Sequence, residues 1–171
     1  LSTANLQVVQ TQSHASGYVI EQTFGQQSPA GEPQKEVLFS YPHPKPHPDP
    51  EDYILENKII EMTGSAPTGS SIHVALFHLK RDNFIDALIA AHNKGVSVHI
   101  ILEDDGTNKN AISKLTTHLG SSRVTACLEA CLGDKINHNK FFLFSALGSS
   151  KNIVVQSSAN CSGQLKLATV L

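Results

Sequence analysis

The segment with the clearest chemical content is Asn137–Ser145, which reads N-H-N-K-F-F-L-F-S. His138 and Lys140 are two residues apart at the start of a strongly β-prone run. Residues i and i+2 of a strand point to the same side, so an imidazole and an ammonium would face one ligand. Fifteen residues after Ser145, in the stretch S-S-A-N, comes Asn160. It lies just beyond the next predicted strand, where its amide could converge on the same point.

At these residues the sequence resembles the phospholipase D superfamily. The family motif runs His-any-Lys, four residues, Asp, and a Gly-Ser-any-Asn segment follows on the next strand. The residues that match are His138, Lys140, Ser158 and Asn160. Two positions differ, because Ser145 stands where the family has Asp and Ser157 where it has Gly. The residues around the motif are most similar to those of secreted phospholipase D-like proteins.

The resemblance implies a phosphodiesterase. His138 would attack phosphorus and form a phosphohistidine, which water or an alcohol then resolves. Lys140 and the amide of Asn160 would stabilise charge on the non-bridging oxygens. Ser158 and Ser145 would bind substrate by hydrogen bonds. Since side chains supply the positive field, no metal and no cofactor are expected.

The resemblance also implies that half of the site comes from elsewhere. The family uses two His-any-Lys copies, one to attack and one to protonate the leaving oxygen. Here His92-Asn93-Lys94 repeats the letters but closes a predicted helix before Gly95, where cations favour the helix dipole. His43-Pro44-Lys45 lies in a proline-rich loop. We therefore expect a homodimer, or a second half-chain, to supply another histidine.

Three functions remain open at this point. The first is hydrolysis of a phospholipid headgroup, and the second is a metal-independent nuclease with the same chemistry. The third is a secreted binding or toxin-like protein with weakened or lost activity. A net charge of −2 weighs mildly against nucleic acid as the partner. Acidic residues Glu103 to Asp105 are expected to be solvated and not to bind metal, and His78 stands near a strand end from which it could reach the site.

Elements that could position these residues follow from the hydrophobic pattern. Residues 1–35 are interpreted as an N-terminal arm or edge strands, and residues 36–171 as one phospholipase D-like α/β domain. The segment 42–50 alternates prolines and is expected to be an exposed loop. Predicted helices cover 52–64, 82–93 (with Asp82 as N-cap) and 109–119, and predicted strands cover 36–41, 72–79, 96–102, 141–145 and 153–156. Their alternation predicts a mixed, mostly parallel sheet flanked by helices.

The compartment is predicted from weaker signals. No apolar run approaches the ~18 residues of a transmembrane segment. The chain opens with Leu1 and shows no signal peptide, as a processed secretory product would. Cys127 and Cys131 are close enough for a local disulfide, which would fit an oxidising compartment, although reduced thiols are the alternative. We expect a secreted protein.

Overall fold

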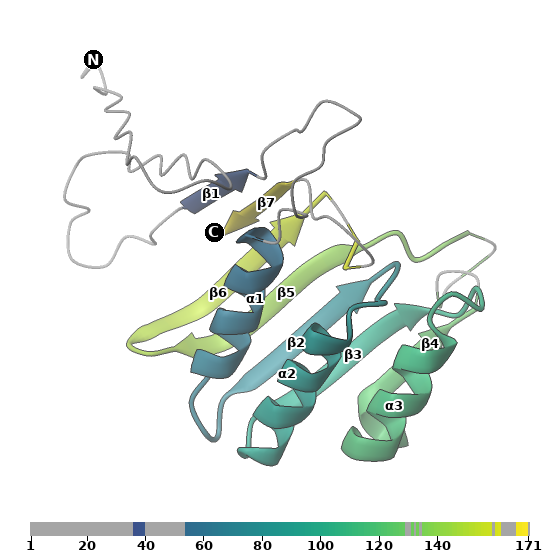
Figure 1. Ribbon diagram of the computed structural model, residues 1–171, viewed down its shortest axis with the longest axis horizontal. Coiled ribbons are helices and arrows are strands. Elements are labelled where there is room, and N and C mark those ends of the chain that lie inside the picture. The colour runs from purple at the N-terminus through teal and green to yellow at the C-terminus, as the bar shows by residue number, and fades with distance from the viewer. Residues whose placement is uncertain are drawn as a thin grey trace, which may run out of the picture.

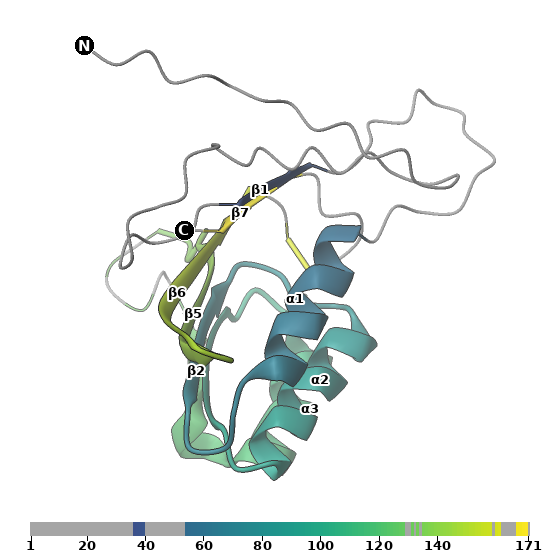
Figure 2. The same ribbon diagram turned by 90° about the vertical axis from the view of Figure 1, so that its left-hand side faces the viewer.

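The computed structural model describes residues 36–39, 54–128, 131, 133, 135–158, 160–161 and 167–170. Within this part, the chain forms a mixed seven-stranded sheet with three helices (Figure 1). All three helices lie on the same face of the sheet (Figure 2). No helix in the described part is long and apolar enough to span a membrane.

The elements follow one another in the order in which the sequence pattern predicts most of them. The helices are α1 (Ile54–Ser65), α2 (Asp82–Asn93) and α3 (Lys109–Leu119), with a 3₁₀ turn at Ser121–Arg123. The strands are β1 (Glu36–Phe39), β2 (Ser71–Leu76), β3 (Ser97–Glu103), β4 (Val124–Cys127), β5 (Lys140–Leu147), β6 (Ser150–Ser157) and β7 (Leu167–Val170). Across the sheet their order is β1-β7-β6-β5-β2-β3-β4.

Strand directions confirm a mixed sheet and correct one detail of the prediction. β2, β3 and β4 are parallel neighbours, joined by crossovers through α2 and α3. The pairs β2–β5, β5–β6, β6–β7 and β7–β1 are antiparallel, so in the described sheet most pairings are antiparallel. The expectation of a mostly parallel sheet is wrong because β5 and β6 are joined by a tight turn at Gly148, which returns the chain alongside itself.

The core lies between the sheet and the helices. Alternate strand residues point toward the helices and are buried, while their neighbours point to the opposite face. The largest buried side chains of this layer include Leu76, Ile100, Phe142 and Phe144 on the strands and Phe84 and Leu88 on α2. On the opposite face, which no helix covers in the described part, Ile101 and Leu143 remain partly exposed.

Several element boundaries differ from the sequence prediction. Arg81, not Asp82, is the N-cap residue of α2, and Asp82 occupies the first turn, where a carboxylate complements the helix dipole. The short strands β4 and β7 are additions to the predicted elements. The predicted arm, 1–35, and the proline-rich loop, 42–50, lie outside the described residues.

Candidate active site

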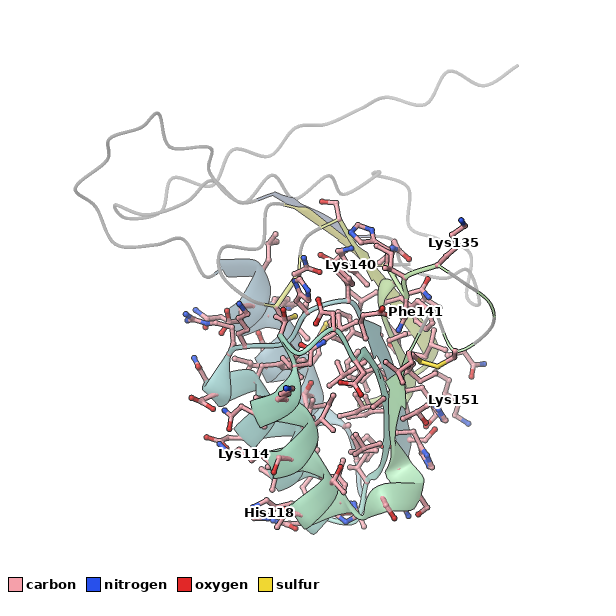
Figure 3. All side chains as sticks on the ribbon, turned by 90° about the vertical axis from the view of Figure 1, so that its right-hand side faces the viewer. Lys114, His118, Lys135, Lys140, Phe141 and Lys151 are labelled. Atoms are coloured by element: carbon pink, nitrogen blue, oxygen red, sulfur yellow. A yellow bond between two sulfur atoms is a disulfide. The ribbon has the colours of Figure 1, made fainter. Side chains whose placement is uncertain are left out.

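One end of the sheet gathers the residues that the sequence singles out. Parallel strands β2, β3 and β4 end there, and the antiparallel strand β5 begins there with Lys140. Figure 3 shows Lys140 at this end and His118, at the end of α3, at the opposite one. We call this end of the sheet the site edge.

His138 and Lys140 meet at the site edge, as their spacing predicts. The Lys140 Nζ lies 3.1 Å from Nδ1 and 3.2 Å from Nε2 of the His138 ring, and it donates to the His138 carbonyl oxygen at 3.0 Å. The His138 side chain is exposed, whereas Lys140 is only 4% exposed. An exposed imidazole thus rests on the ammonium of a buried lysine.

The burial of Lys140 changes its acid–base chemistry. Loss of hydration disfavours the charged form, so burial lowers the pKa of Lys140 below the ordinary lysine value. The position of Lys140 in the sheet explains the burial. On one side Lys140 pairs with Leu76 of β2. On the other side lies β6, where Gln156 pairs with Phe141 and is followed by Ser157. Ser157, which stands in the family's Gly position, is itself buried. A cation held in this way is weakly screened and attracts an anion strongly.

A buried glutamate fixes the segment that carries His138. The Glu103 carboxylate, at the end of β3, accepts a hydrogen bond from the Asn137 backbone N–H at 2.7 Å. Both residues are 4% exposed. The Asn137 side chain in turn accepts 2.7 Å and 3.4 Å hydrogen bonds from the side chain and backbone N–H of Asn139. Sequence reasoning assigned Glu103 to a solvated acidic loop, and it missed this positioning contact.

A second buried residue ties the strand ends together. Asn108 is fully buried and donates to the carbonyl oxygens of Phe77 and Glu103, each at 2.7 Å. Its Oδ1 accepts the Leu79 N–H at 2.8 Å. Phe77 also donates its backbone N–H to the Asn139 carbonyl oxygen. The site edge is therefore cross-linked by hydrogen bonds from β2 to β3 and from β2 to the start of β5.

Asn160 and Ser158 reach the same edge after β6 ends. Cys161 forms a bridge with Leu79, and its carbonyl oxygen accepts the Lys80 N–H at 2.8 Å. Because β5 lies between β6 and β2, the chain must cross the start of β5 to make this bridge. Asn160 is half-buried, and its Oδ1 has no hydrogen-bond partner within the described residues. Ser158 is exposed. Neither is hydrogen-bonded to His138 in this part of the chain.

Ser145, predicted to bind substrate, lies at the other end of β5. It follows Lys140 by five residues, which at ~3.3 Å per residue is about 16 Å along the strand. Its exposed hydroxyl accepts the Ser71 backbone N–H at 2.8 Å, at the start of β2. The structure therefore does not bring Ser145 to the site edge. The residue in the family's Asp position supports the strand pairing here, and its substitution removes no charge next to His138.

A second histidine stands at the site edge beside the first. The His78 Nε2 lies 2.7 Å from the Asp105 Oδ2, and the pKa of Asp105 is lowered chiefly by this hydrogen bond. The Phe77 ring stacks on His78 at 3.8 Å and contacts His138 at 4.8 Å, centroid to centroid. His78 thus joins the neighbourhood that its strand-end position suggested. Phe77 was missed, because an apolar residue in an apolar strand gives no chemical signal.

The other histidine copies and the cysteines have separate places. His92 lies in the last turn of α2, where its helix-stop signals place it. Cys127 and Cys131 form the predicted disulfide. Cys161 is a buried thiol, and burial raises its pKa to about 12, so it is not nucleophilic. Within the described residues no three His, Cys, Asp or Glu side chains are grouped to bind a metal ion.

Comparison with known proteins shows the family and the fold of the chain. The family described as "Cardiolipin synthase, PLD-like domain" matches residues 59–165. Nuc, a phospholipase D family member from Salmonella typhimurium, is 20% identical with a TM-score of 0.52, over 81% of this chain and 82% of that chain. NucT from Helicobacter pylori is 19% identical with a TM-score of 0.53, over 80% and 83%. At such identities the two structures show a shared fold. No curated protein matches the chain.

Proposed function

The chain belongs to the phospholipase D-like family, and from this premise we propose that it hydrolyses a phospholipid headgroup through a phosphohistidine intermediate. The observation that carries the proposal is the exposed imidazole of His138 against the buried ammonium of Lys140. The imidazole is open to substrate, and the cation beside it is placed to hold the phosphoryl oxygens.

The reaction has two steps. A ring nitrogen of His138 attacks phosphorus, the P–N bond forms, and the P–O bond to the leaving alcohol breaks with its electron pair on oxygen. A second imidazolium gives that oxygen its proton. Water then attacks phosphorus, the P–N electron pair returns to His138, and the second imidazole takes the water's proton. Lys140, together with the amide of Asn160, stabilises the charge that develops on the non-bridging oxygens in both steps.

We propose that a second copy of the chain, or a second half-chain, supplies the other imidazole. In a symmetric dimer each copy would contribute one His138 to a shared site. The match covers more than four-fifths of each of the two similar structures, so each of them consists mostly of the fold seen here. This supports an assembly of two single-motif chains.

A nuclease would use the same chemistry on a different phosphodiester. The net charge of −2 gives no excess of cations to neutralise a run of phosphates. Instead, the residues next to the His138 segment include exposed apolar side chains, Leu128 and Ile136. These observations favour lipid over nucleic acid. An inactive binding protein is also disfavoured, because Ser145, the residue that departs most from the family motif, lies away from His138.

The test is hydrolysis of bis(p-nitrophenyl) phosphate by the purified protein, with His138→Ala and His92→Ala compared. His92 is the matched control, since it begins a second His-Asn-Lys triplet, which lies at the end of α2. We expect turnover that resists EDTA, falls at least ~100-fold in His138→Ala and persists in His92→Ala. Specific activity should rise with protein concentration as chains pair. Equal activity in wild-type protein and His138→Ala would refute the proposal.

A further inference from the structure

The Phe77 ring lies where the reactive side chains of the site edge meet. Phe77 follows β2 directly and is half-buried. Its ring lies 4.8 Å from the His138 ring, centroid to centroid, at an interplanar angle of 52°. The Lys140 Nζ lies over the same ring, 5.6 Å from its centroid. One aromatic side chain therefore adjoins both members of the proposed catalytic pair.

The hydrogen bonds of His138 do not fix the angle of its imidazole. Within the described residues, the ring nitrogens have Lys140 as their only hydrogen-bond partner. The Lys140 Nζ lies 3.1 Å from one ring nitrogen and 3.2 Å from the other, so it favours neither. An aromatic neighbour can supply the missing orientation, because packed rings prefer particular mutual angles.

The backbone of Phe77 is held firmly enough to give such support. Its N–H donates to the Asn139 carbonyl oxygen at 2.9 Å, and its carbonyl oxygen accepts a hydrogen bond from the Asn108 Nδ2 at 2.7 Å. Asn108 is fully buried. Both polar backbone groups of Phe77 are thus fixed, one of them to the segment that carries His138.

A second ring holds the Phe77 side chain. The His78 ring stacks on it at 3.8 Å, with an interplanar angle of 22°. The His78 Nε2 lies 2.7 Å from the Asp105 Oδ2, and the Asp105 Oδ1 accepts the Thr107 N–H at 2.9 Å. The hydrogen bond to His78 is the main reason why the pKa of Asp105 is lowered. A charged carboxylate in the loop after β3 therefore supports Phe77 through His78.

The Phe77 ring suits the ammonium of Lys140 because it attracts a cation without carrying a charge. The face of an aromatic ring is negative and attracts a cation within about 6 Å. In the described part of the chain no carboxylate forms an ion pair with Lys140. A carboxylate would cancel the field that phosphoryl oxygens need, whereas the ring leaves the charge available.

We infer that Phe77 is a positioning residue for the proposed reaction: its ring orients the His138 imidazole for attack and stabilises the ammonium of Lys140. The inference rests on the proposed function and adds to it a residue that acts through the two reacting side chains. Misplacement of a reacting group by about 1 Å can cost ~100-fold in rate. Loss of the ring should therefore lower kcat more than it changes KM.

Removal of the ring should also move the alkaline limit of activity. Burial lowers the pKa of Lys140, and without the ring the charged form loses a further stabilising contact, so activity should fall at a lower pH. The other titratable groups described at the site edge are His78, Glu103, Asp105 and His138. Carboxylates and imidazoles as classes titrate well below lysines, so a shifted alkaline limit reports Lys140.

The experiment replaces Phe77 by Leu, by Tyr, which keeps the ring, and by pentafluorophenylalanine, which keeps the ring but removes its negative face. The control is Phe141→Leu. Phe141 is also half-buried and follows Lys140 directly (Figure 3), but it lines a cavity with His73 and His99 away from the site edge. Hydrolysis of bis(p-nitrophenyl) phosphate across pH gives kcat and KM. An NMR titration of the Lys140 Cε follows its charge without turnover, and thermal melts check folding.

We expect Phe77→Leu to lower kcat about 10- to 100-fold and to shift both the alkaline limit and the Lys140 titration to lower pH. Phe77→Tyr and Phe141→Leu should match wild-type protein. The fluorinated ring should shift the Lys140 titration to lower pH and leave the thermal melt unchanged.

Phe77→Leu with the kcat and the Lys140 titration of wild-type protein overturns the inference. Equal changes in Phe77→Leu and Phe141→Leu overturn it as well, because they would reflect general loosening of the sheet. If wild-type protein shows no turnover but the Lys140 titration still shifts in Phe77→Leu, the proposed function is rejected and the effect of the ring on Lys140 is supported.

Discussion

Lys140 combines burial with a charge that the chemistry needs. Lys140 is 4% exposed, and its ammonium contacts both ring nitrogens of His138. Burial penalises the charge, so the residue costs stability in return for a strong local field. Such a compromise is common at functional sites, and it makes Lys140 the residue at which stability and activity should respond to mutation in opposite directions.

Replacing Lys140 by Met should lower activity and raise stability. Without the ammonium, we expect kcat to fall about 100- to 1,000-fold, while the free energy of unfolding at neutral pH rises by the order of 1 kcal/mol. The pKa of Lys140 is lower in the folded than in the unfolded chain. At pH values between these two pKa values the unfolded chain binds more protons, so the free energy of unfolding of the wild-type protein rises with pH. The difference in unfolding free energy between Lys140→Met and wild-type protein therefore shrinks as the pH rises through this range. Urea titrations at several pH values measure this difference.

The same lowered pKa predicts the alkaline limit of activity. As pH rises, Lys140 loses its proton before an ordinary lysine does, so activity should fall at a pH below the ordinary lysine value. Lys140→Arg keeps the charge throughout, and any residual activity of this variant should show no alkaline fall. An identical alkaline limb in wild-type protein and Lys140→Arg would assign the limb to another group.

At the scale of elements, the end of β3 sets the position of His138. Glu103 both pairs with Cys127 of β4 and accepts the Asn137 N–H with its carboxylate. The segment that carries His138 precedes β5 and has no regular secondary structure of its own from Ile136 to Asn139. Its position therefore depends on this contact and on the Phe77–Asn139 hydrogen bond from β2.

Removal of the Glu103 carboxylate should loosen the segment. Glu103→Ala leaves the buried Asn137 N–H without its acceptor, and we expect a loss of about 1–3 kcal/mol in unfolding free energy. Displacement of His138 by about 1 Å would cost up to ~100-fold in kcat. Glu103→Gln retains an acceptor oxygen and should recover most of both quantities. Thermal melts measure the change in stability, and steady-state kinetics measure the change in kcat. A Glu103→Ala variant with the stability and kcat of wild-type protein would show that Glu103 does not position the segment.

Sequence reasoning predicts that His138 and Lys140 lie together, but not the residues that support them. His138 and Lys140 could be found because two polar residues at i and i+2 interrupt an apolar strand pattern. Glu103 and Asn108 are buried by contacts with residues distant in sequence, at the end of β2 and before β5. No local sequence pattern predicts such contacts. Ser145 was placed with the site by motif alone. The length of an extended strand already separates it from Lys140.

For the whole molecule, alternation of helices and strands was enough to predict the α/β class. It could not give the direction of each strand, because β5 and β7 enter the sheet next to strands distant in sequence. The tight turn after Leu147 was a local signal for antiparallel pairing of β5 with β6, and it was available in the sequence as Gly148–Ser149. Secretion and pairing of two chains are not decided by the fold and stay predictions.

The central claim is that His138 forms a covalent bond to phosphorus. The most direct test mixes the protein with a phosphodiester that has a good leaving group, quenches within the first turnover under alkaline denaturing conditions, and maps the modified peptide by mass spectrometry. We predict a phosphoryl adduct on His138 that forms with the initial burst of leaving group and is absent from His138→Ala. Full turnover with no adduct on His138, or with an adduct on another residue, would contradict the account.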